Sequence, residues 1–245
     1  MPIIREISWP RIFAEGATIV ISILLAFGIE AWWSDRQIRQ DVQNNLIALR
    51  EELDSNLGVI ERELSYRQAV ISSIESLDTT NSNESALTPD EVDKLLGDLT
   101  WIGKSEFSTG ALLSILQSGV FANIEDGELR RLLAGLPAFY ENVVQFELAD
   151  VESTVGQFFA YINANGSFNQ IANTQGSGRP GTGELAFDTR YRVAERHDHS
   201  QLLKSDEFLG ILTIEHANHL DVVYNTQRLK SKIESAIALI DLQVP

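Results

Sequence analysis

The chain has 245 residues, of which 35 are acidic and 19 basic, and its formal net charge is −16. This charge excludes a basic nucleic-acid-binding protein, and a hydrophobic content of 44% excludes a wholly disordered chain. The absence of cysteine excludes a disulfide scaffold, a thiol nucleophile and a thiolate metal site. The mean hydropathy of −0.06 is that of an ordinary acidic soluble protein, but most of the continuous apolarity lies in the first 33 residues.

This N-terminal apolar segment predicts a membrane-spanning helix. Residues 16–29 carry no charge but cover only about 21 Å as a helix, whereas residues 12–33 cover about 33 Å and match the hydrocarbon core of a bilayer. Trp9 precedes this span, and Trp32 and Trp33 end it, where tryptophan rings act as interfacial anchors. We therefore expect residues 12–33 to cross a membrane.

A cleaved signal peptide is the competing interpretation of this segment. It is disfavoured because the chain lacks a strongly basic leader and because EAWWSDRQ, which contains no small-residue cleavage site, follows the apolar run. Basic residues are nearly balanced on the two sides of the span, so they specify its orientation only weakly. We expect residues 1–11 to form a cytoplasmic tail and residues 34–245 to lie outside the cytoplasm, as in a single-pass protein of the bacterial inner membrane with a periplasmic domain.

Small and polar side chains recur every four residues along the predicted span. Such a stripe allows another membrane helix to approach closely. The alternative is that small residues are common in any membrane helix and that the glutamates near its two ends simply reach the headgroups. The stripe consists of Ala14, Thr18, Ser22, Ala26 and Glu30.

Apolar positions continue at helical spacing beyond the span. Neither glycine nor proline occurs between Trp33 and Gly58, and apolar residues repeat 11 positions apart, as at Leu46 and Leu57. An 11-residue period is 3.67 residues per turn, which predicts a nearly straight stalk helix over 34–77 that continues the span. Its apolar stripe must be covered by other elements.

The rest of the chain predicts those covering elements. Thr88 is a helix N-cap followed by proline, Ser118 and Gly119 end a short apolar helix, and Pro137 should kink the long helix that contains it. We therefore expect an all-α fold, an elongated antiparallel helical bundle. Its predicted parts after the stalk are short helices at 89–99 and 111–118, a long helix at 128–164, a Gly-rich loop at 165–201 and a last helix at 206–242.

Four stretches of the chain resemble a family of uncharacterised bacterial single-pass membrane proteins. An apolar span ends in EAWWSDR and leads into a charged helix containing LIALREELDSN. LLSILQSGVFANIEDGELRRLL and LLKSDEFLGIL are similar to the short helix, the following helix start and the last helix of that family. The resemblance implies an N-terminal transmembrane helix joined to an extramembrane helical bundle. It implies no catalytic residues.

The motifs of catalysis and cofactor binding are absent or out of context. Gly176, Gly178 and Gly181 satisfy the spacing of a dinucleotide-binding loop, but no predicted strand precedes them and no predicted helix follows. Arg190, Arg192 and Arg196 form a small basic cluster that would dock an acidic partner or, more simply, pair with acidic helices of the same chain. We expect no cofactor, no small-molecule substrate and no enzymatic activity.

Four histidines lie in the last quarter of the sequence, and two of them are candidate metal ligands. His216 and His219 are three residues apart on the predicted last helix and therefore share a face, with Glu215 as a possible third ligand. The simpler interpretation is a set of solvated or capping histidines. His197 and His199 flank Asp198 near the end of the predicted loop.

These features leave three classes of function open. The first is a non-catalytic scaffold or accessory subunit of a larger membrane complex, in which the span packs on other subunits within the lipid bilayer; respiratory and photosynthetic assemblies use single-span subunits of this kind. The second is a membrane-anchored sensor or signalling module, and the third a metal-binding or enzymatic bundle. The predicted loop at 165–201 is either a surface loop or a docking loop for a partner protein.

Overall fold

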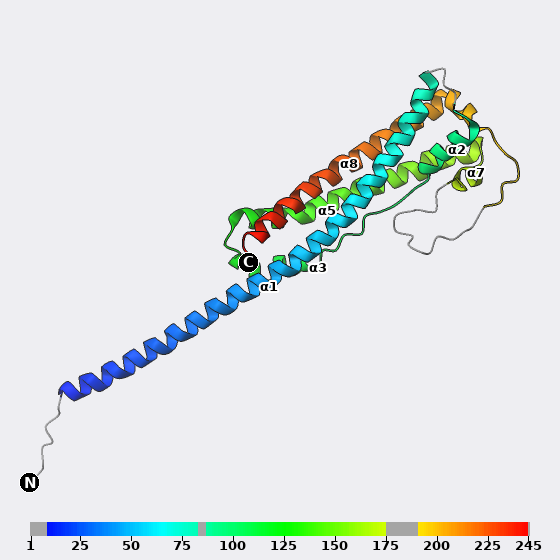
Figure 1. The fold of residues 1–245 in the computed structure, drawn as a ribbon. Coiled ribbons are helices and arrows are strands. Elements are labelled where there is room, and N and C mark those ends of the chain that lie inside the picture. Colours follow the sequence, from blue (N-terminus) through cyan, green and yellow to red (C-terminus); the bar gives the residue numbers. More distant parts are fainter. Residues whose placement is uncertain (1–8, 83–86, 175–190, 245) are drawn as a thin grey trace, which may run out of the picture.

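The computed structural model describes residues 9–82, 87–174 and 191–244. Every regular element within these residues is a helix, which confirms the predicted all-α fold. Helix α1 (Trp9–Ser82) is 74 residues long and contains both the predicted span and the predicted stalk without a break. Figure 1 shows that the N-terminal half of α1 projects from a bundle formed by its C-terminal half and the remaining helices.

The bundle is built on three long helices. Helix α5 (Gly127–Ser153) continues through a π-helical turn, η1 (Thr154–Phe159), into α6 (Ala160–Asn165), and helix α8 (Asp206–Asp241) ends the chain. Five shorter helices complete the fold as described: α2 (Pro89–Asp98), α3 (Gly110–Gln117), α4 (Val120–Asn123), α7 (Phe168–Ala172) and the 3-10 helix η2 (His199–Lys204).

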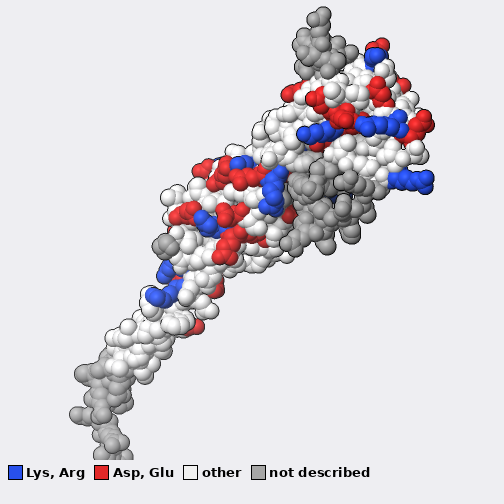
Figure 2. Space-filling view, turned by 45° about the vertical axis from the view of Figure 1, so that its right-hand side comes forward, with Lys and Arg blue, Asp and Glu red and all other residues white. Residues whose placement is uncertain are grey.

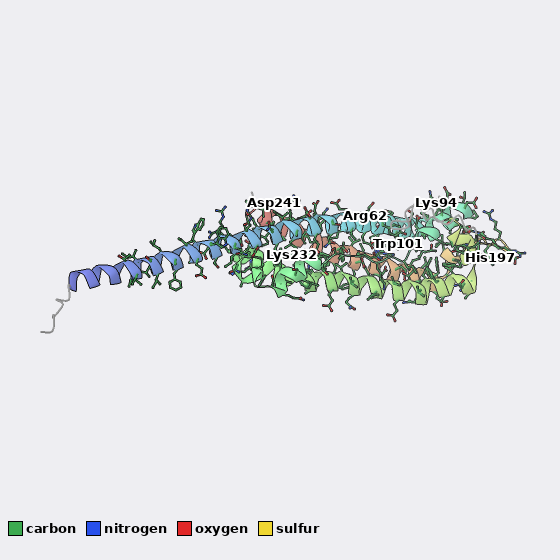
Figure 3. All side chains as sticks on the ribbon, turned by 90° about the horizontal axis from the view of Figure 1, so that it is seen from below. Arg62, Lys94, Trp101, His197, Lys232 and Asp241 are labelled. Carbon is green, nitrogen blue, oxygen red and sulfur yellow. The ribbon has the colours of Figure 1, made fainter. Side chains whose placement is uncertain are left out.

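Side-chain pairs fix the directions of the long helices. Arg50 contacts Asp241, and Glu61 contacts Lys230, so α8 runs antiparallel to α1. Asn142 of α5 donates to Asn225 of α8, and Thr154, directly after α5, donates to Glu215 of α8, so α8 is also antiparallel to α5. Helix α5 therefore runs in the same direction as α1, and α8 is antiparallel to both. In Figure 3, Lys232 and Asp241 lie toward the stalk, whereas Lys94 and His197 lie at the far end.

A crossing segment, residues 101–109, allows α1 and α5 to run in the same direction. It returns the chain from α2 at the far end to α3 at the end near the stalk. The Asn56 amide donates to the Ser108 carbonyl and accepts from the Ser108 N–H, at 2.7 and 2.9 Å. The Glu52 carboxylate accepts from the Ala111 and Leu112 N–H groups, which caps the start of α3.

Two apolar cores fill the bundle, and a polar layer separates them. The core near the stalk is formed mainly by residues 46–60 of α1, 129–143 of α5 and 229–240 of α8. The core at the far end joins the last turns of α1 to α2, η1, α6, η2 and the start of α8. The central polar layer, named here, lies between them and consists of Glu63, Arg67, Glu147, Asp150, Thr154, Glu215 and His219.

The predicted loop at 165–201 is not irregular throughout. Ser167 accepts a hydrogen bond from the Gln170 N–H and so starts α7, and Asp198 accepts from the Ser200 N–H and starts η2. These local caps give short helices where the sequence shows no long apolar period. Residues 175–190, with the three glycines of the dinucleotide-like pattern and Arg190, lie outside the described residues.

Candidate functional site

The first candidate site is the uncovered part of α1. Every side chain from residue 17 to residue 41 is exposed, and coverage by the bundle begins at Val42. Figure 2 shows that the described surface of this projecting part is mostly uncharged, whereas acidic and basic groups crowd the bundle. Among the described residues, α1 is the helix that is long and apolar enough to cross a membrane.

Four residues of the predicted small and polar stripe, Thr18, Ser22, Ala26 and Glu30, lie on this uncovered surface. The Ser22 hydroxyl donates to the Thr18 carbonyl at 2.8 Å, so the hydroxyl is satisfied within its own helix. Ala26 and Glu30 are exposed. Ala14 and Trp9 lie in α1, but their side chains are outside the described set.

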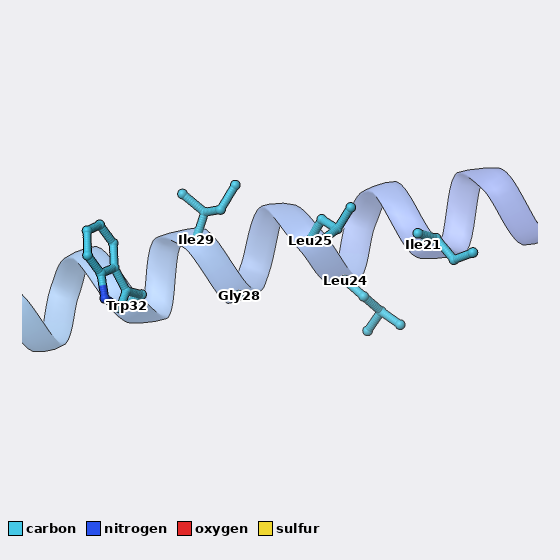
Figure 4. Close-up of a pocket in the computed structure, with 6 residues that line it drawn as sticks. All are labelled: Ile21, Leu24, Leu25, Gly28, Ile29 and Trp32. Atoms are coloured by element: carbon cyan, nitrogen blue, oxygen red, sulfur yellow. The ribbon is translucent and has the colours of Figure 1, made fainter.

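Two of the predicted tryptophan anchors, Trp32 and Trp33, are also exposed, and a shallow hollow lies on the helix surface beside Trp32. Trp32 and Trp33 are 57% and 63% exposed, and the Arg36 guanidinium lies 5.9 Å from the centre of the Trp32 ring. Gly28 leaves a shallow notch on the helix surface because it has no side chain (Figure 4). The residues around the notch are Ile21, Leu24, Leu25, Ile29 and Trp32.

The second candidate site is the central polar layer, where Arg67 holds the three long helices together. Its Nε donates to Glu63 at 2.7 Å, and its Nη1 contacts both Asp150 of α5 and His219 Nδ1 of α8, the latter at 2.7 Å. The guanidinium also lies 5.1 Å from the centre of the Trp101 ring on the crossing segment. Burial lowers the pKa of Arg67, but Asp150 and Glu63 outweigh it and raise the pKa overall, so Arg67 stays charged.

Hydroxyl and backbone groups satisfy two further buried carboxyl groups of this layer. Glu215 accepts from Ser153 Oγ at 3.0 Å and from Thr154 Oγ1 at 2.6 Å. Glu147 accepts from the N–H and the hydroxyl of Ser105. Burial raises the pKa of Glu215 because it penalises the charged form, although the hydroxyl donors oppose the rise.

The histidine of this layer is held in its neutral form. Burial lowers the pKa of His219 to about 4; Asp150 opposes this fall, and Arg67 adds to it. His219 Nδ1 accepts the hydrogen bond from Arg67, which requires the proton of the neutral ring on Nε2. A neutral imidazole is the form that binds metal ions.

The structure brings only part of the predicted histidine group together. Glu215 and His219 lie in the central polar layer, where Asp150 joins them, and single ligand atoms of these three residues all lie within 4.8 Å of one another. His216 points to the α1 side of α8, where its Nε2 lies 3.5 Å from Glu75. Asp150 comes from a different helix, so its spacing in the sequence does not reveal it.

A signal for the central polar layer nevertheless exists in the sequence. Arg67 is three residues after Leu64 and four residues before Ile71, a position at which the apolar stripe of α1 predicts another apolar side chain. Glu147 and Glu215 interrupt the stripes of α5 and α8 in the same way. Polar residues at core spacing in each long helix are therefore the pattern that sequence reasoning missed.

A second buried histidine closes the far end of the bundle. His199 Nδ1 contacts Asp93 Oδ1 at 2.6 Å, and its Nε2 accepts from the Ser167 N–H at 2.9 Å. The other Asp93 oxygen accepts from the Gln170 amide at 2.6 Å. A Cβ at Gly166 would lie 2.6 Å from the His199 ring, so glycine allows the imidazole to sit against the backbone. Both ring nitrogens are occupied by structural contacts.

The basic cluster contributes surface contacts. Arg196 forms an ion pair with Asp90 at the start of α2, and both side chains are largely exposed. The Arg192 carbonyl accepts from the Asn169 amide, and Arg192 itself is exposed. His197 is exposed and stacks on the His199 ring.

No family model, curated protein or solved structure matches this chain.

Proposed function

We propose that the protein is a single-pass membrane protein that acts without catalysis, as a scaffold or accessory subunit of a larger membrane protein complex. The observation that carries this proposal is the uncovered part of α1, residues 17–41. Its residues 17–33 present an almost continuous apolar surface, which is unstable in water and requires lipid or protein around it. One continuous helix joins the proposed anchor to the extramembrane domain.

The proposed topology places the tail before the span in the cytoplasm and the bundle in the periplasm. Trp33 is nine residues before Val42, which corresponds to about 14 Å of helix between the aromatic belt and the first covered residue. From residue 34 onward, 17 basic and 32 acidic residues give the domain a formal charge of −15. This charge disfavours docking on anionic lipid and favours contact with a protein surface. Protease digestion of the bundle in intact spheroplasts would support the topology, and full protection would contradict it.

A pair of matched substitutions tests how the span meets its partner. Ala26 lies on the small and polar stripe, and Gly28 lies on the notched face of the same helix. A Cβ at Gly28 meets no atom within 4 Å, so the side chain of Gly28→Leu starts in open space. We expect Ala26→Leu to abolish co-purification of partner subunits in mild detergent, because the larger side chain blocks close helix approach, and Gly28→Leu to leave it intact.

Native purification followed by mass spectrometry measures this outcome. If the wild-type chain extracted in mild detergent migrates alone as a monomer, the accessory-subunit proposal fails. If Gly28→Leu removes the partner and Ala26→Leu does not, the subunit proposal survives but the notched face replaces the stripe as the contact.

The second candidate is a sensor or signalling module, and the unbroken course of α1 favours it. A helix that passes from the span into the bundle and carries Arg67 of the central polar layer would transmit a rotation or an axial shift across the interface. A sensor requires an output on the other side of the membrane. Deletion of residues 2–8 with no change in any cellular response would count against this candidate.

A further inference from the structure

The central polar layer contains a set of ligand atoms that the scaffold or subunit role does not use. Glu215 and His219 are four residues apart on α8 and therefore lie one turn apart on one face. Asp150 meets them from α5, and one ligand atom from each residue lies within 4.8 Å of the others. All three residues are at most 3% exposed.

One atom of this group has an unfilled hydrogen-bonding capacity. Asp150 Oδ2 is occupied by Arg67, but Asp150 Oδ1 is buried, and no described residue hydrogen-bonds to it. It faces His219 Nδ1 at 3.9 Å. A buried carboxylate oxygen without a donor is costly, so this position calls for a positively charged or hydrogen-bonding occupant.

The charge of the central polar layer points to a cation. Four buried carboxyl groups, those of Glu63, Glu147, Asp150 and Glu215, surround one buried guanidinium, that of Arg67. His219 Nδ1 accepts a hydrogen bond from Arg67, so this ring nitrogen carries no proton. Without protons or another cation, the layer holds more negative charge than Arg67 can balance.

We propose that Asp150, Glu215 and His219 bind one divalent transition-metal ion. Two carboxylates and one imidazole are a hard-to-borderline set of oxygen and nitrogen ligands, which suits Zn²⁺, Mn²⁺, Fe²⁺ or Co²⁺. Arg67 contacts Asp150 through the other carboxylate oxygen, so it keeps that contact and orients the ligand from outside the coordination sphere. It gives up only its hydrogen bond to His219 Nδ1 if that nitrogen is the ligand.

The backbone around Glu215 supports its position in this set. The π-helical turn η1 begins at Thr154, and the Thr154 hydroxyl donates to Glu215 Oε2 at 2.6 Å. Ser153, the residue before the turn, donates to the other oxygen at 3.0 Å. Each Glu215 oxygen keeps lone-pair capacity for a metal ion while a hydroxyl holds its orientation.

Metal binding is tested on the full-length chain in detergent with Co²⁺, whose visible absorption reports bound ligands. We expect one Co²⁺ per chain, with displacement of Co²⁺ by Zn²⁺ and an increase in the melting temperature. Glu215→Gln retains the hydroxyl contacts but is expected to weaken Co²⁺ binding at least about 10-fold. Asp150→Asn is expected to weaken it similarly.

Glu147→Gln is the matched control. Glu147 is buried in the same layer and accepts two hydrogen bonds from Ser105, but it lies outside the ligand group. We expect this variant to bind Co²⁺ like the wild type, and His216→Asn to do so as well. If the folded wild-type chain shows no Co²⁺ absorption and no metal-dependent melting shift, or if Glu147→Gln and Glu215→Gln lose Co²⁺ equally, the proposal is overturned. Neither result bears on whether the span binds partner subunits.

Discussion

Two buried aspartate–histidine pairs occupy this bundle, and they are completed in different ways. At the far end, His199 Nδ1 and Asp93 Oδ1 contact each other, the Ser167 N–H fills the other ring nitrogen, and the Gln170 amide fills the other carboxylate oxygen. In the central polar layer, charged Arg67 bridges Asp150 and His219, and one Asp150 oxygen has no donor among the described residues. Every polar side-chain atom of the first pair has a partner. The second pair links α5 to α8 through Arg67 and leaves one Asp150 oxygen able to bind a further group.

The difference follows from the elements that supply each pair. Short elements, α2, η2 and the start of α7, surround His199. Backbone groups at the ends of short helices are not used within the helix, and one of them, the Ser167 N–H, donates to the His199 ring, while the Asp93 side chain contacts its other nitrogen. Only the sides of long helices surround His219, where the backbone groups are already used within the helices. A side chain must therefore complete the Asp150–His219 pair, and the charged Arg67 does so.

Replacement of Arg67 should have the largest effect on stability. Arg67→Met keeps much of the side-chain volume but leaves Asp150 and Glu63 buried without their cation, so we expect a loss of about 3–5 kcal/mol in the free energy of unfolding. Denaturant titration followed by circular dichroism measures this loss. Arg62→Met, at an exposed position of the same helix, is the control and should change little. A loss below about 1 kcal/mol for Arg67→Met would show that the layer does not depend on its arginine.

Acid should weaken the central pair through His219. The pKa of this ring is about 4 in the folded protein, against an ordinary value of 6.5. Between pH 4 and pH 6.5, the ring is therefore protonated in the unfolded chain but neutral in the folded chain. The contribution of His219 to stability is therefore complete above pH 6.5 and falls by about 3 kcal/mol as the pH drops through 4.

Comparison with His219→Asn isolates this contribution. The raised pKa values of Glu63 and Glu215 act in the opposite direction, because the folded state takes up their protons more readily than the unfolded chain. Asparagine accepts from Arg67 but does not titrate. The free energy of unfolding, measured from pH 7.5 down to pH 4, should therefore fall more steeply for the wild type than for the variant. Equal slopes would mean that the folded protein accommodates a protonated His219.

The sequence predicts the helices of this protein better than it predicts their contacts. The period of the apolar residues is a local property, and it correctly indicates an all-α fold in which one helix joins the span to the stalk. The central polar layer depends on register: Arg67, Asp150 and His219 meet because the crossing segment sets α5 beside α1 in one particular alignment. Hydrogen bonds from Asn56 to Ser108 and from Ser105 to Glu147 fix that alignment, and no local period encodes them.

At the far end, His199→Asn removes one ring nitrogen and should have an intermediate effect on the free energy of unfolding. The amide of His199→Asn can replace the contact from Nδ1 to Asp93 but cannot reach the Ser167 N–H, which is left without an acceptor. We expect a loss of about 2 kcal/mol. Amide hydrogen exchange should localise the effect to α7 and η2, with the core near the stalk still protected. Equal loosening of both ends would contradict the view of His199 as a local joint.

The smallest loss of stability is expected for an ion pair between α1 and α8 that lies at the surface. Lys230 of α8 contacts Glu61 of α1 at 3.1 Å and so links the same two helices as Arg67 and His219, but the Lys230 and Glu61 side chains are 29% and 62% exposed. Lys230→Met keeps the apolar stem and should cost about 0.5 kcal/mol or less, because water solvates Glu61 when its partner is lost.

Lys230→Met is the same type of change as Arg67→Met on the same pair of helices, so burial is the main variable between the two. Added salt screens the exposed pair and should remove the small effect of Lys230→Met, whereas the effect of Arg67→Met should persist. If both variants lost similar stability, the number of charges joining α1 to α8 would matter more than their burial, and the central layer would be an ordinary ion-pair network. A much larger loss for Arg67→Met than for Lys230→Met would mean that the buried Arg67, and not the surface ion pair, holds the three long helices together.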